Sequence, residues 1–311
     1  MCYSAMIYSE LKQYKRATGA TMDVHEYVRT FWVDRGKNPF LKRPKVPRAM
    51  EIEILREGPT EIADYIRQWD ALEMAGLEQE LFKQKKRVAD GERALLTKVT
   101  RKAENDVRIG GDKMDRIQGR MQALKRLQPK TADSRIFPGY FAPVLVMENG
   151  HKVLKPMRYQ CRPAGKPALY DTRFPGTYNA RRDNLEGFWR EQFGHSHGLI
   201  IADVFYENVE VQGQNERLAF VPRNGEPMYI ACLWSHWKDP KGVEPDLLSF
   251  AAITDEPEPE VAAAGHDRTI INIKPEHLDA WLSPHGDLQR MQAIFDDKQH
   301  PYYEHQIDKA A

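Results

Sequence analysis

The 311-residue sequence has few cysteines: Cys2, Cys161 and Cys232 are scattered along it. An odd, dispersed set is not a disulfide framework, and the lack of any CxxC pair argues against a zinc site. No apolar run approaches the ~18 residues of a membrane span. The N-terminus also lacks the basic start and long apolar stretch of a signal peptide. We therefore expect a reduced, cytoplasmic and nucleoid-associated protein without a membrane partner.

The chain also has little net charge, because 46 Lys and Arg stand against 45 Asp and Glu, which gives +1. That total hides a split, since residues 81–130 carry +9 and residues 11–50 carry +7, whereas residues 131–311 carry −7. A chain divided in this way can hold a polyanion locally while it is neutral overall. Aromatic residues make up 10% of the sequence, which excludes a chain that is disordered throughout.

Walker, GxGxxG, GxSxG and HExxH motifs are absent, so the common nucleotide-binding and hydrolase classes receive no support. The pair His195 and His197 has the spacing of two ligands on one strand face, but no third ligand is apparent. We therefore predict neither a metal nor a cofactor.

The apolar pattern predicts an α+β protein. After Pro138, short apolar runs alternate with Gly, Pro and Asn or Asp breaks, which is typical of a mainly antiparallel sheet. These runs are APVLVM, LIIADVFYE, LAFVP, PMYIACLW, LLSFAAIT and TIINI. A further short strand is expected in MCYSAMIYS at the N-terminus, and helices are expected over 184–192 and 275–282.

Helical spacing of apolar residues from Thr60 to residue 128 predicts a helical hairpin, with a break at Gly110-Gly111 and an end at Pro129. The expected layout is a core of residues 1–9 and 131–285, a basic connecting segment 10–59, a helical insertion 60–130 and a polar C-terminal tail 286–311. The insertion either holds a polyanion through its cations or is a solvated hairpin used for packing, dimerisation or a protein partner.

Four short segments carry residues suited to chemistry. If Met1 is removed, Cys2 becomes an N-terminal aminothiol, with an amine pKa of roughly 7.7–8.0 beside a thiol pKa of roughly 8.5. Such a group forms an imine with an aldehyde and then closes a thiazolidine, or it serves as a peptidase nucleophile. Taken alone, Cys2 is better explained as merely the residue after the start codon.

The other three segments surround an amide, a carboxylate and an imidazole. Asn179, followed by Arg181 and Arg182, suits a loop that holds a phosphate. Glu207 ends a strongly apolar strand, where desolvation would raise its pKa toward a useful acid–base range. His266 is a natural proton shuttle near pH 7, and Arg268 close to it suits a phosphate. In isolation each segment is also compatible with a solvated loop, strand end or turn.

Taken in order, these segments resemble the SRAP family (SOS response-associated peptidase), whose members crosslink to abasic sites in single-stranded DNA. The family pattern appears as Met1-Cys2, Asn179-Ala180-Arg181, Ala202-Asp203-Val204-Phe205-Tyr206-Glu207 and His266-Asp267-Arg268. Residues 138–143 look like the "R-Y-N-x-A-P" segment, and the strand ending at Thr254 corresponds to the strand before the histidine. The resemblance covers residues 1–9 and about 134–285.

The resemblance implies a compact SRAP-like fold and a set of roles. Cys2 would attack the ring-opened aldehyde of an abasic site, Asn179 would position the reacting centre, Glu207 would act as acid and base, and His266 would shuttle protons. DNA would be held by Arg181, Arg182, Arg268 and Thr254. The resemblance also implies abasic-site lyase and autopeptidase activities. Single-stranded DNA usually stacks on aromatic rings, for which the candidates are Tyr178, Trp189 and Phe205.

The chain departs from the family pattern mainly around the nucleophile. Tyr3 and Ser4 replace a glycine and a DNA-contacting arginine, Val204 and Asn208 replace a glycine and a tryptophan, and Thr269-Ile270 replaces Met-Pro. The catalytic set is kept and the DNA-contact set is altered. The function we expect is a covalent sensor of abasic sites in single-stranded DNA; the alternatives are a non-covalent nucleic-acid-binding protein on the same fold, or a cysteine peptidase.

Overall fold

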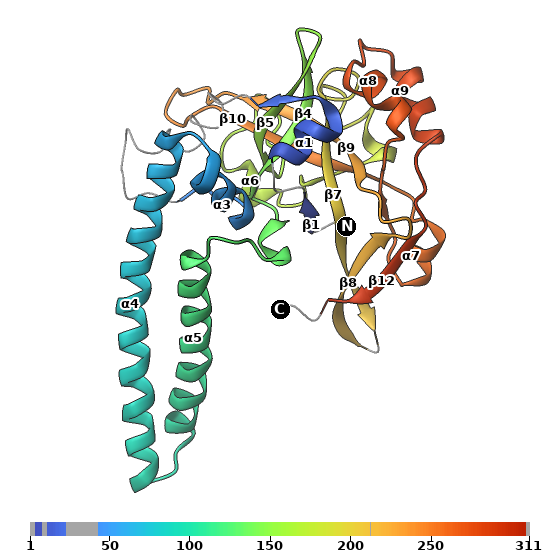
Figure 1. The fold of residues 1–311 in the computed structure, drawn as a ribbon. Helices are drawn as coiled ribbons and strands as arrows, with labels where there is room; N and C mark the ends of the chain where they lie inside the picture. The colour runs from blue at the N-terminus through green and yellow to red at the C-terminus, as the bar shows by residue number, and fades with distance from the viewer. Residues whose placement is uncertain (1–3, 8–10, 23–42, 212, 309–311) are drawn as a thin grey trace. The chain divides into compact units, whose positions relative to one another are not determined.

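The computed structural model describes residues 4–7, 11–22, 43–211 and 213–308 (Figure 1). The chain divides into two compact units, the first formed by Met1–Met50 with Lys130–Ala311 and the second by Glu51–Pro129. Among the described helices, none combines the length and the apolar character that a membrane crossing requires.

The first unit is built around a small closed barrel. Its five strands pair in the order β10, β5, β4, β7 and β9, and β9 pairs with β10 again to close the ring. The pairing of β5 with β10 is parallel and the others are antiparallel. The strands are β4 (Phe141–Glu148), β5 (His151–Tyr159), β7 (His197–Val211), β9 (Met228–Trp237) and β10 (Leu247–Asp255).

A second, antiparallel layer grows from the far half of β7 and runs in the order β3, β1, β7, β8 and β12. It contains β1 (Ser4–Ile7), β3 (Arg135–Ile136), β8 (Gln214–Pro222) and β12 (Tyr303–Ile307). Three short strands pair on the barrel: β2 (Thr21–Met22) with β5, and β6 (Asn179–Arg181) and β11 (Thr269–Ile270) with β10. The predicted α+β class with a mainly antiparallel core is confirmed.

The helices of the first unit are short. They are α1 (Leu11–Thr18), the start of α3 (Arg48–Glu57), α6 (Tyr170–Arg173), α7 (Pro259–Ala263), α8 (Leu278–Leu282), α9 (Leu288–Asp296) and the 3-10 turns Thr131–Ser134, Arg182–Asn184 and Pro275–His277. Helix α1 places Tyr14 in the same apolar core as Trp281 and Phe295. Part of the segment expected only to connect is therefore core structure; residues 23–42 lie outside the described residues.

Two predictions from the sequence are wrong in this unit. Residues 184–192, expected to be a helix, form a 3-10 turn at Arg182–Asn184 followed by turns. The C-terminal segment, expected to be a polar tail, forms α9 with Met291, Ile294 and Phe295 buried, and then β12, which pairs with β8. Polar residues face solvent on both elements, so the average composition of the segment concealed its buried side.

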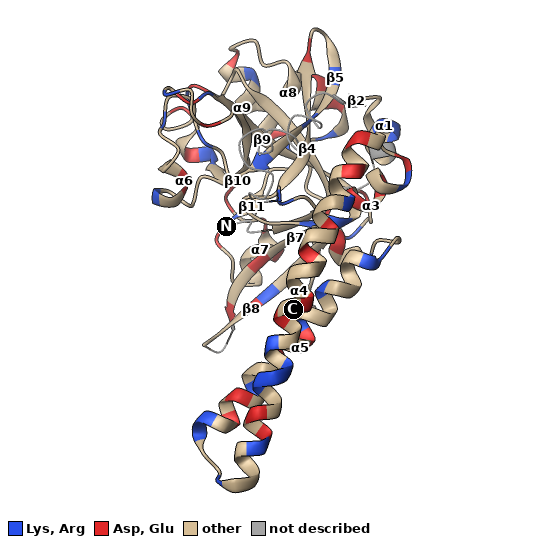
Figure 2. Ribbon diagram, turned by 90° about the vertical axis from the view of Figure 1, so that its left-hand side faces the viewer, with Lys and Arg blue, Asp and Glu red and all other residues tan. Residues whose placement is uncertain are grey.

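The second unit is the predicted helical hairpin, made of α4 (Thr60–Thr97) and α5 (Arg101–Lys125). Figure 2 shows acidic and basic residues alternating along it. Two ion pairs join the helices, Arg87 with Asp106 and Arg120 with Glu73. The turn lies at residues 98–100, where the Thr100 side chain accepts a hydrogen bond from the Ala103 amide and so caps α5.

Gly110 and Gly111 do not break the helix, which is a correction to the sequence prediction. Gly110 is buried between the two helices, and a Cβ placed on it would lie 2.6 Å from Cγ2 of Val88. Gly91 on α4 is also buried, and its Cβ would lie 3.0 Å from Cγ2 of Val107. These glycines therefore permit a close approach of the helices, an effect that a single-helix propensity scale does not include.

The two adjacent glycines provide a matched pair for testing this packing. Gly110→Ala is expected to lower the free energy of unfolding by about 1–3 kcal/mol, because its methyl group collides with a stiff valine. Gly111→Ala, with nothing within 4 Å of its Cβ, is expected to raise it by about 0.5–1 kcal/mol. Urea unfolding of the full chain, followed by far-UV circular dichroism, measures both values. Equal responses would contradict close packing at Gly110.

Candidate functional site

A carboxyl–imidazole contact lies at the centre of the candidate site. Glu207 extends from β7, where Phe205, Glu207 and Val209 alternate inward and are buried. Its Oε2 lies 3.3 Å from Nε2 of His266, and the exposed fraction of the Glu207 side chain is 1%. His266 is held in the loop between α7 and β11, where its amide donates to the Val261 carbonyl. Sequence-distant groups predicted to act together therefore meet.

Burial decides where the proton of this pair resides. It raises the pKa of Glu207 to about 8, since the charged carboxylate loses its hydration. Burial likewise lowers the pKa of His266 below its usual value. Nδ1 of His266 lies 2.9 Å from the Arg268 carbonyl oxygen, a contact that the Nδ1–H tautomer satisfies, and 3.2 Å from the Arg268 amide, which donates to Nδ1 in the Nε2–H tautomer. In the first tautomer the Nε2 lone pair faces Glu207. At neutral pH the pair is a carboxylic acid opposite a neutral imidazole.

Strand β10 connects several of the remaining candidates, because it pairs with both β6 and β11. Ala252 is paired with Asn179, and Thr254 is paired with Arg181 on β6 and with Ile270 on β11. Thr254 thus lies between the strand that carries Asn179 and the strand that follows His266.

Asn179 and Thr254 are buried and bear polar atoms in want of a partner. Within the described ranges, neither the nitrogen nor the oxygen of the Asn179 side-chain amide makes a hydrogen bond. The Thr254 hydroxyl makes none there either. Most buried polar atoms in folded proteins are hydrogen-bonded, because an unpaired one costs about 1–3 kcal/mol. Buried polar atoms with unused hydrogen-bonding capacity are suited to holding a bound molecule.

The three predicted phosphate ligands lie in different environments. The exposed Arg181 donates to Asp183 beside it, with Nη2 and Oδ2 2.6 Å apart. Arg182 is turned into an internal network with Asp255, Asp296 and Gln292. Arg268 is 7% exposed, and no ion pair to it is found in the described part of the chain. Arg181 and Arg268 are therefore better placed to meet an anion than Arg182.

Cys2 and Tyr3 lie outside the described residues, which begin at Ser4 on β1. Ser4 is completely buried, and its hydroxyl accepts hydrogen bonds from Arg135 at 2.7 and 3.0 Å. Arg135 also pairs with Asp308 and stacks 3.5 Å from the centre of the Tyr206 ring. This buried network holds β1 in place through Arg135, which is 131 positions away from Ser4 in the sequence. The network has no signature in the sequence, because each member is an isolated polar residue.

The prediction that three aromatic rings stack on DNA bases is wrong for two of them. Phe205 is fully buried against Phe220, and Trp189 is 3% exposed in the apolar core. Neither ring is available to a base. Tyr178 is half-buried and contacts Tyr159 edge to face, so it is the one ring of the three that keeps exposed surface.

His197 has a structural environment. It packs against the rings of Phe193 and Trp281, donates from Nδ1 to the Trp281 carbonyl and accepts at Nε2 from the Gly194 amide. Burial lowers its pKa to about 3, so it is neutral. Both ring nitrogens are occupied, and no group of His, Cys, Asp or Glu among the described residues is arranged to hold a metal ion.

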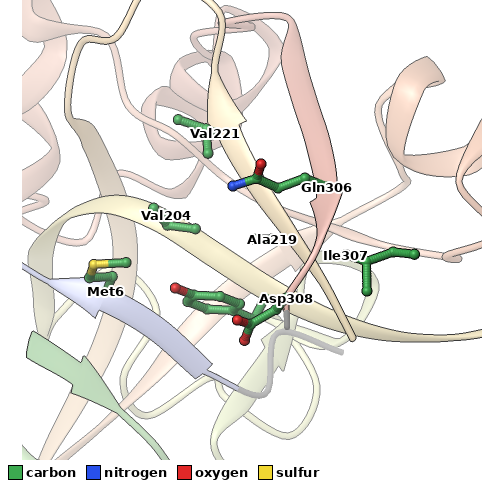
Figure 3. A pocket seen from close by; sticks show the side chains of 8 residues that line it. Met6, Val204, Ala219, Val221, Gln306, Ile307 and Asp308 are labelled. Carbon is green, nitrogen blue, oxygen red and sulfur yellow. The ribbon is translucent and has the colours of Figure 1, made fainter. Parts of the chain in front are cut away.

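An open pocket of about 610 Å³ lies on the other side of β7 (Figure 3). Its lining includes Met6, Val204, Tyr206, Val221 and Asp308. Because strand side chains alternate, Val204 and Tyr206 face this pocket while Phe205 and Glu207 face away from it. The pocket is thus separate from the acid–base pair, and its Asp308 carboxylate is already bound by Arg135 and Arg217.

The fold and site define an α+β barrel protein with a buried carboxylic acid opposite a neutral imidazole. The sequence model of the family "SOS response associated peptidase (SRAP)" matches residues 93–310, and the chain belongs to that family. The matched range includes α5 as well as the barrel. Among curated proteins, none matches the chain.

Solved structures resemble the chain at low identity. A protein from Bordetella bronchiseptica is 20% identical, with a TM-score of 0.47, over 57% of this chain and 87% of that chain. A protein from Bacteroides thetaiotaomicron is 13% identical, with a TM-score of 0.49, over 57% and 78%. A phage-related protein from Bordetella bronchiseptica is 19% identical, with a TM-score of 0.43, over 56% and 81%.

Two buried threonines test whether Thr254 is kept for a ligand. Thr254→Val removes an unpartnered hydroxyl and is expected to leave the free energy of unfolding unchanged or to raise it by up to ~1 kcal/mol. Thr269→Val is the control, because its hydroxyl accepts from the Glu258 amide, and we expect a loss of about 1–3 kcal/mol. Urea unfolding measures both. A comparable loss in Thr254→Val would reveal a structural role for that hydroxyl.

Proposed function

We propose that this protein forms a covalent adduct with abasic sites in single-stranded DNA through Cys2, after removal of Met1. The observation that carries the proposal is the buried Glu207–His266 pair in a member of the SRAP family. An abasic site presents no base edge, so its recognition depends on phosphates, shape and the sugar aldehyde.

The proposed reaction begins with the closed sugar of the abasic site. Protonated Glu207 donates a proton to the ring oxygen while the anomeric hydroxyl loses one, and the C–O bond of the ring breaks to give the aldehyde. The neutral amine of Cys2 then adds to the aldehyde carbon, and loss of water gives an imine. Finally the Cys2 thiol adds to the imine carbon, the thiol proton moves to nitrogen, and the five-membered thiazolidine closes.

The surrounding side chains have roles that follow from their positions. His266 accepts the proton facing it from Glu207 and returns it, which lets one carboxyl serve as acid and then as base. Asn179 and Thr254 hold the sugar through their free hydrogen-bonding capacity. Arg181 and Arg268 hold the neighbouring phosphates, whereas Arg182 keeps its internal ion pairs and orders the end of β6.

The same imine explains the associated lyase activity, whereas the autopeptidase reaction precedes it. Loss of a proton from the carbon next to the imine expels the 3′ phosphate by β-elimination, which is a lyase reaction. Removal of Met1 by hydrolysis of the Met1–Cys2 peptide bond is the autopeptidase reaction, with water supplying the hydroxyl and the proton.

Cys2→Ala tests the nucleophile. Wild-type protein that has lost Met1 is expected to form a heat-stable adduct with single-stranded DNA containing an abasic site, and Cys2→Ala is expected to lose the adduct while it retains salt-sensitive binding. Denaturing gels and intact mass measure both outcomes. Retention of Met1, or an adduct that persists in Cys2→Ala, would overturn this proposal; cleavage of other polypeptides would point to a general cysteine peptidase.

Glu207→Gln tests the acid. Imine formation needs a neutral amine, whose pKa is roughly 7.7–8.0, and therefore speeds up as pH rises. Ring opening needs protonated Glu207, whose pKa is about 8, and slows above that pH. The wild-type rate is thus expected to peak near pH 8, and Glu207→Gln is expected to be about 10²–10⁴-fold slower and to lack the alkaline decline. Single-turnover crosslinking measures both profiles.

Stability provides an independent control on the Glu207 pKa. The folded state keeps a proton that the unfolded state releases from about pH 4.3 upward, so this carboxyl makes stability fall as pH rises from about 4 to 8. Glu207→Gln is expected to remove that part of the decline in urea unfolding. An unchanged pH dependence would show that Glu207 is ionised in the folded protein at neutral pH.

A further inference from the structure

The helical hairpin has two unlike flanks beside its packed seam. The seam recurs every three or four residues and consists of Leu77, Leu81, Gln84, Val88 and Gly91 on α4 and Ala103, Val107, Gly110, Met114, Ile117, Met121 and Leu124 on α5. A residue directly before a seam residue is rotated by about 100° to one flank, and a residue directly after it is rotated to the other.

Several charged residues on the first flank form ion pairs with one another. Arg87 and Arg120, which precede seam residues, pair across the hairpin with Asp106 and Glu73. These cross-helix ion pairs also show that the two helices share this flank. What remains on α5 are three exposed cations for which no ion pair is found within the described ranges: Lys102, Lys113 and Arg116, which we call the basic flank.

The opposite flank is not basic. On α5, the residues that directly follow seam residues include Glu104, Arg108 and Asp115, and Arg108 pairs with Asp112 within the helix. The residues of α4 that directly follow its seam residues are Glu78, Phe82, Lys85, Ala89 and Glu92. On α5 the residues before the seam carry a net +3, from Lys102, Lys113, Arg116 and Arg120 against Asp106, whereas those after it carry no net charge, with Arg108 and Lys125 against Glu104 and Asp115. The surplus positive charge of α5 next to the seam is therefore larger on the first flank.

The basic flank has the length and the charge of a backbone-binding surface. Lys102 and Arg116 are 14 residues apart, which is about 21 Å along a helix. That distance spans roughly six nucleotides of a B-form strand. Residues 81–130 carry +9, whereas residues 131–311 carry −7.

We propose that the basic flank binds the phosphate backbone of nucleic acid outside the lesion, without reading its sequence. This inference rests on the proposed function for the kind of polyanion involved. Lys and Arg that neutralise phosphates release condensed counterions, so the contribution of this surface to binding is expected to be strongly salt-dependent.

The test is fluorescence anisotropy of the full-length protein with a labelled single-stranded oligonucleotide that has no abasic site. The test variant is Lys102→Gln/Lys113→Gln/Arg116→Gln. The matched control, Lys85→Gln/Lys86→Gln/Lys125→Gln, removes the same charge from exposed residues of the same hairpin that lie off the basic flank. Circular dichroism verifies that both remain helical.

We expect the test variant to bind more weakly and to reduce the slope of log affinity against log salt by about 2, since each single-strand contact contributes about 0.7. The control variant is expected to keep the wild-type slope. Equal reductions in both variants would mean that bulk charge alone acts, and an unchanged slope in the test variant would mean that the flank does not touch DNA. Either result overturns the inference.

Two further measurements separate the alternatives. The first is binding to vesicles of phosphatidylcholine with phosphatidylserine. If the test variant loses vesicle binding but keeps its affinity and salt slope for DNA, the partner is a lipid surface and the inference is overturned. Crosslinking to abasic DNA is scored separately. If wild-type protein forms no adduct while the test variant still loses its salt slope, the proposed function fails and the backbone-binding surface stands.

Discussion

Strand β7 is the constraint on which the site depends, because it belongs to two sheets at once. Its first half pairs with β9 inside the closed barrel, and residues 197–202 are buried on both faces. Its second half pairs with β8 and β1 and alternates between inward and outward side chains. Glu207 is an inward position of that second half. A register slip of one residue would exchange Glu207 for a neighbour and dissolve the acid–base pair.

Burial of the Glu207 carboxyl, which raises its pKa, costs stability at that position. Arg135 and His197 are also buried polar groups, but each has its hydrogen-bonding groups satisfied by Asp308 and Ser4 or by Trp281 and Gly194. Asn179 and Thr254, by contrast, have unmet capacity within the described residues. Unsatisfied buried polar atoms are uncommon in folded proteins, and functional sites are one place where they occur; within the described residues Oε1 of Gln84, in the seam of the hairpin, is another such atom.

The sequence predicted most of this fold from local patterns. Apolar runs between Gly and Pro gave the barrel strands, and 3.6-residue spacing gave the hairpin. It erred where a residue's role depends on a distant partner. Gly110 was predicted to break a helix because the sequence of one helix does not show its packing against Val88 on the other. The C-terminal segment was predicted to be a tail because its own sequence does not show that β12 pairs with β8.

The site divides in the same way. Glu207 and His266 were found because an acid at the end of an apolar strand and an imidazole in a turn are visible locally, and family resemblance placed them in order. The Ser4–Arg135–Asp308 network could not be found, since it joins three isolated polar residues that only β1, β3 and the end of β12 bring together. Trp189 and Phe205 were misassigned because an aromatic side chain suits a core as well as a DNA surface.

Charge is unevenly distributed along the chain, although each compact unit is close to neutral: residues 51–80 carry −7 and residues 81–130 carry +9. A protein that binds a polyanion needs cations, yet a cation close to Glu207 would favour the carboxylate and lower the pKa that makes it an acid at neutral pH. Surplus Lys and Arg gathered around the pair would thus improve attraction and remove the proton that the chemistry needs. Residues 131–311, which contain Glu207 and His266, instead carry −7. Negative charge near the carboxyl acts in the same direction as burial, since Asp267 also raises the pKa of Glu207.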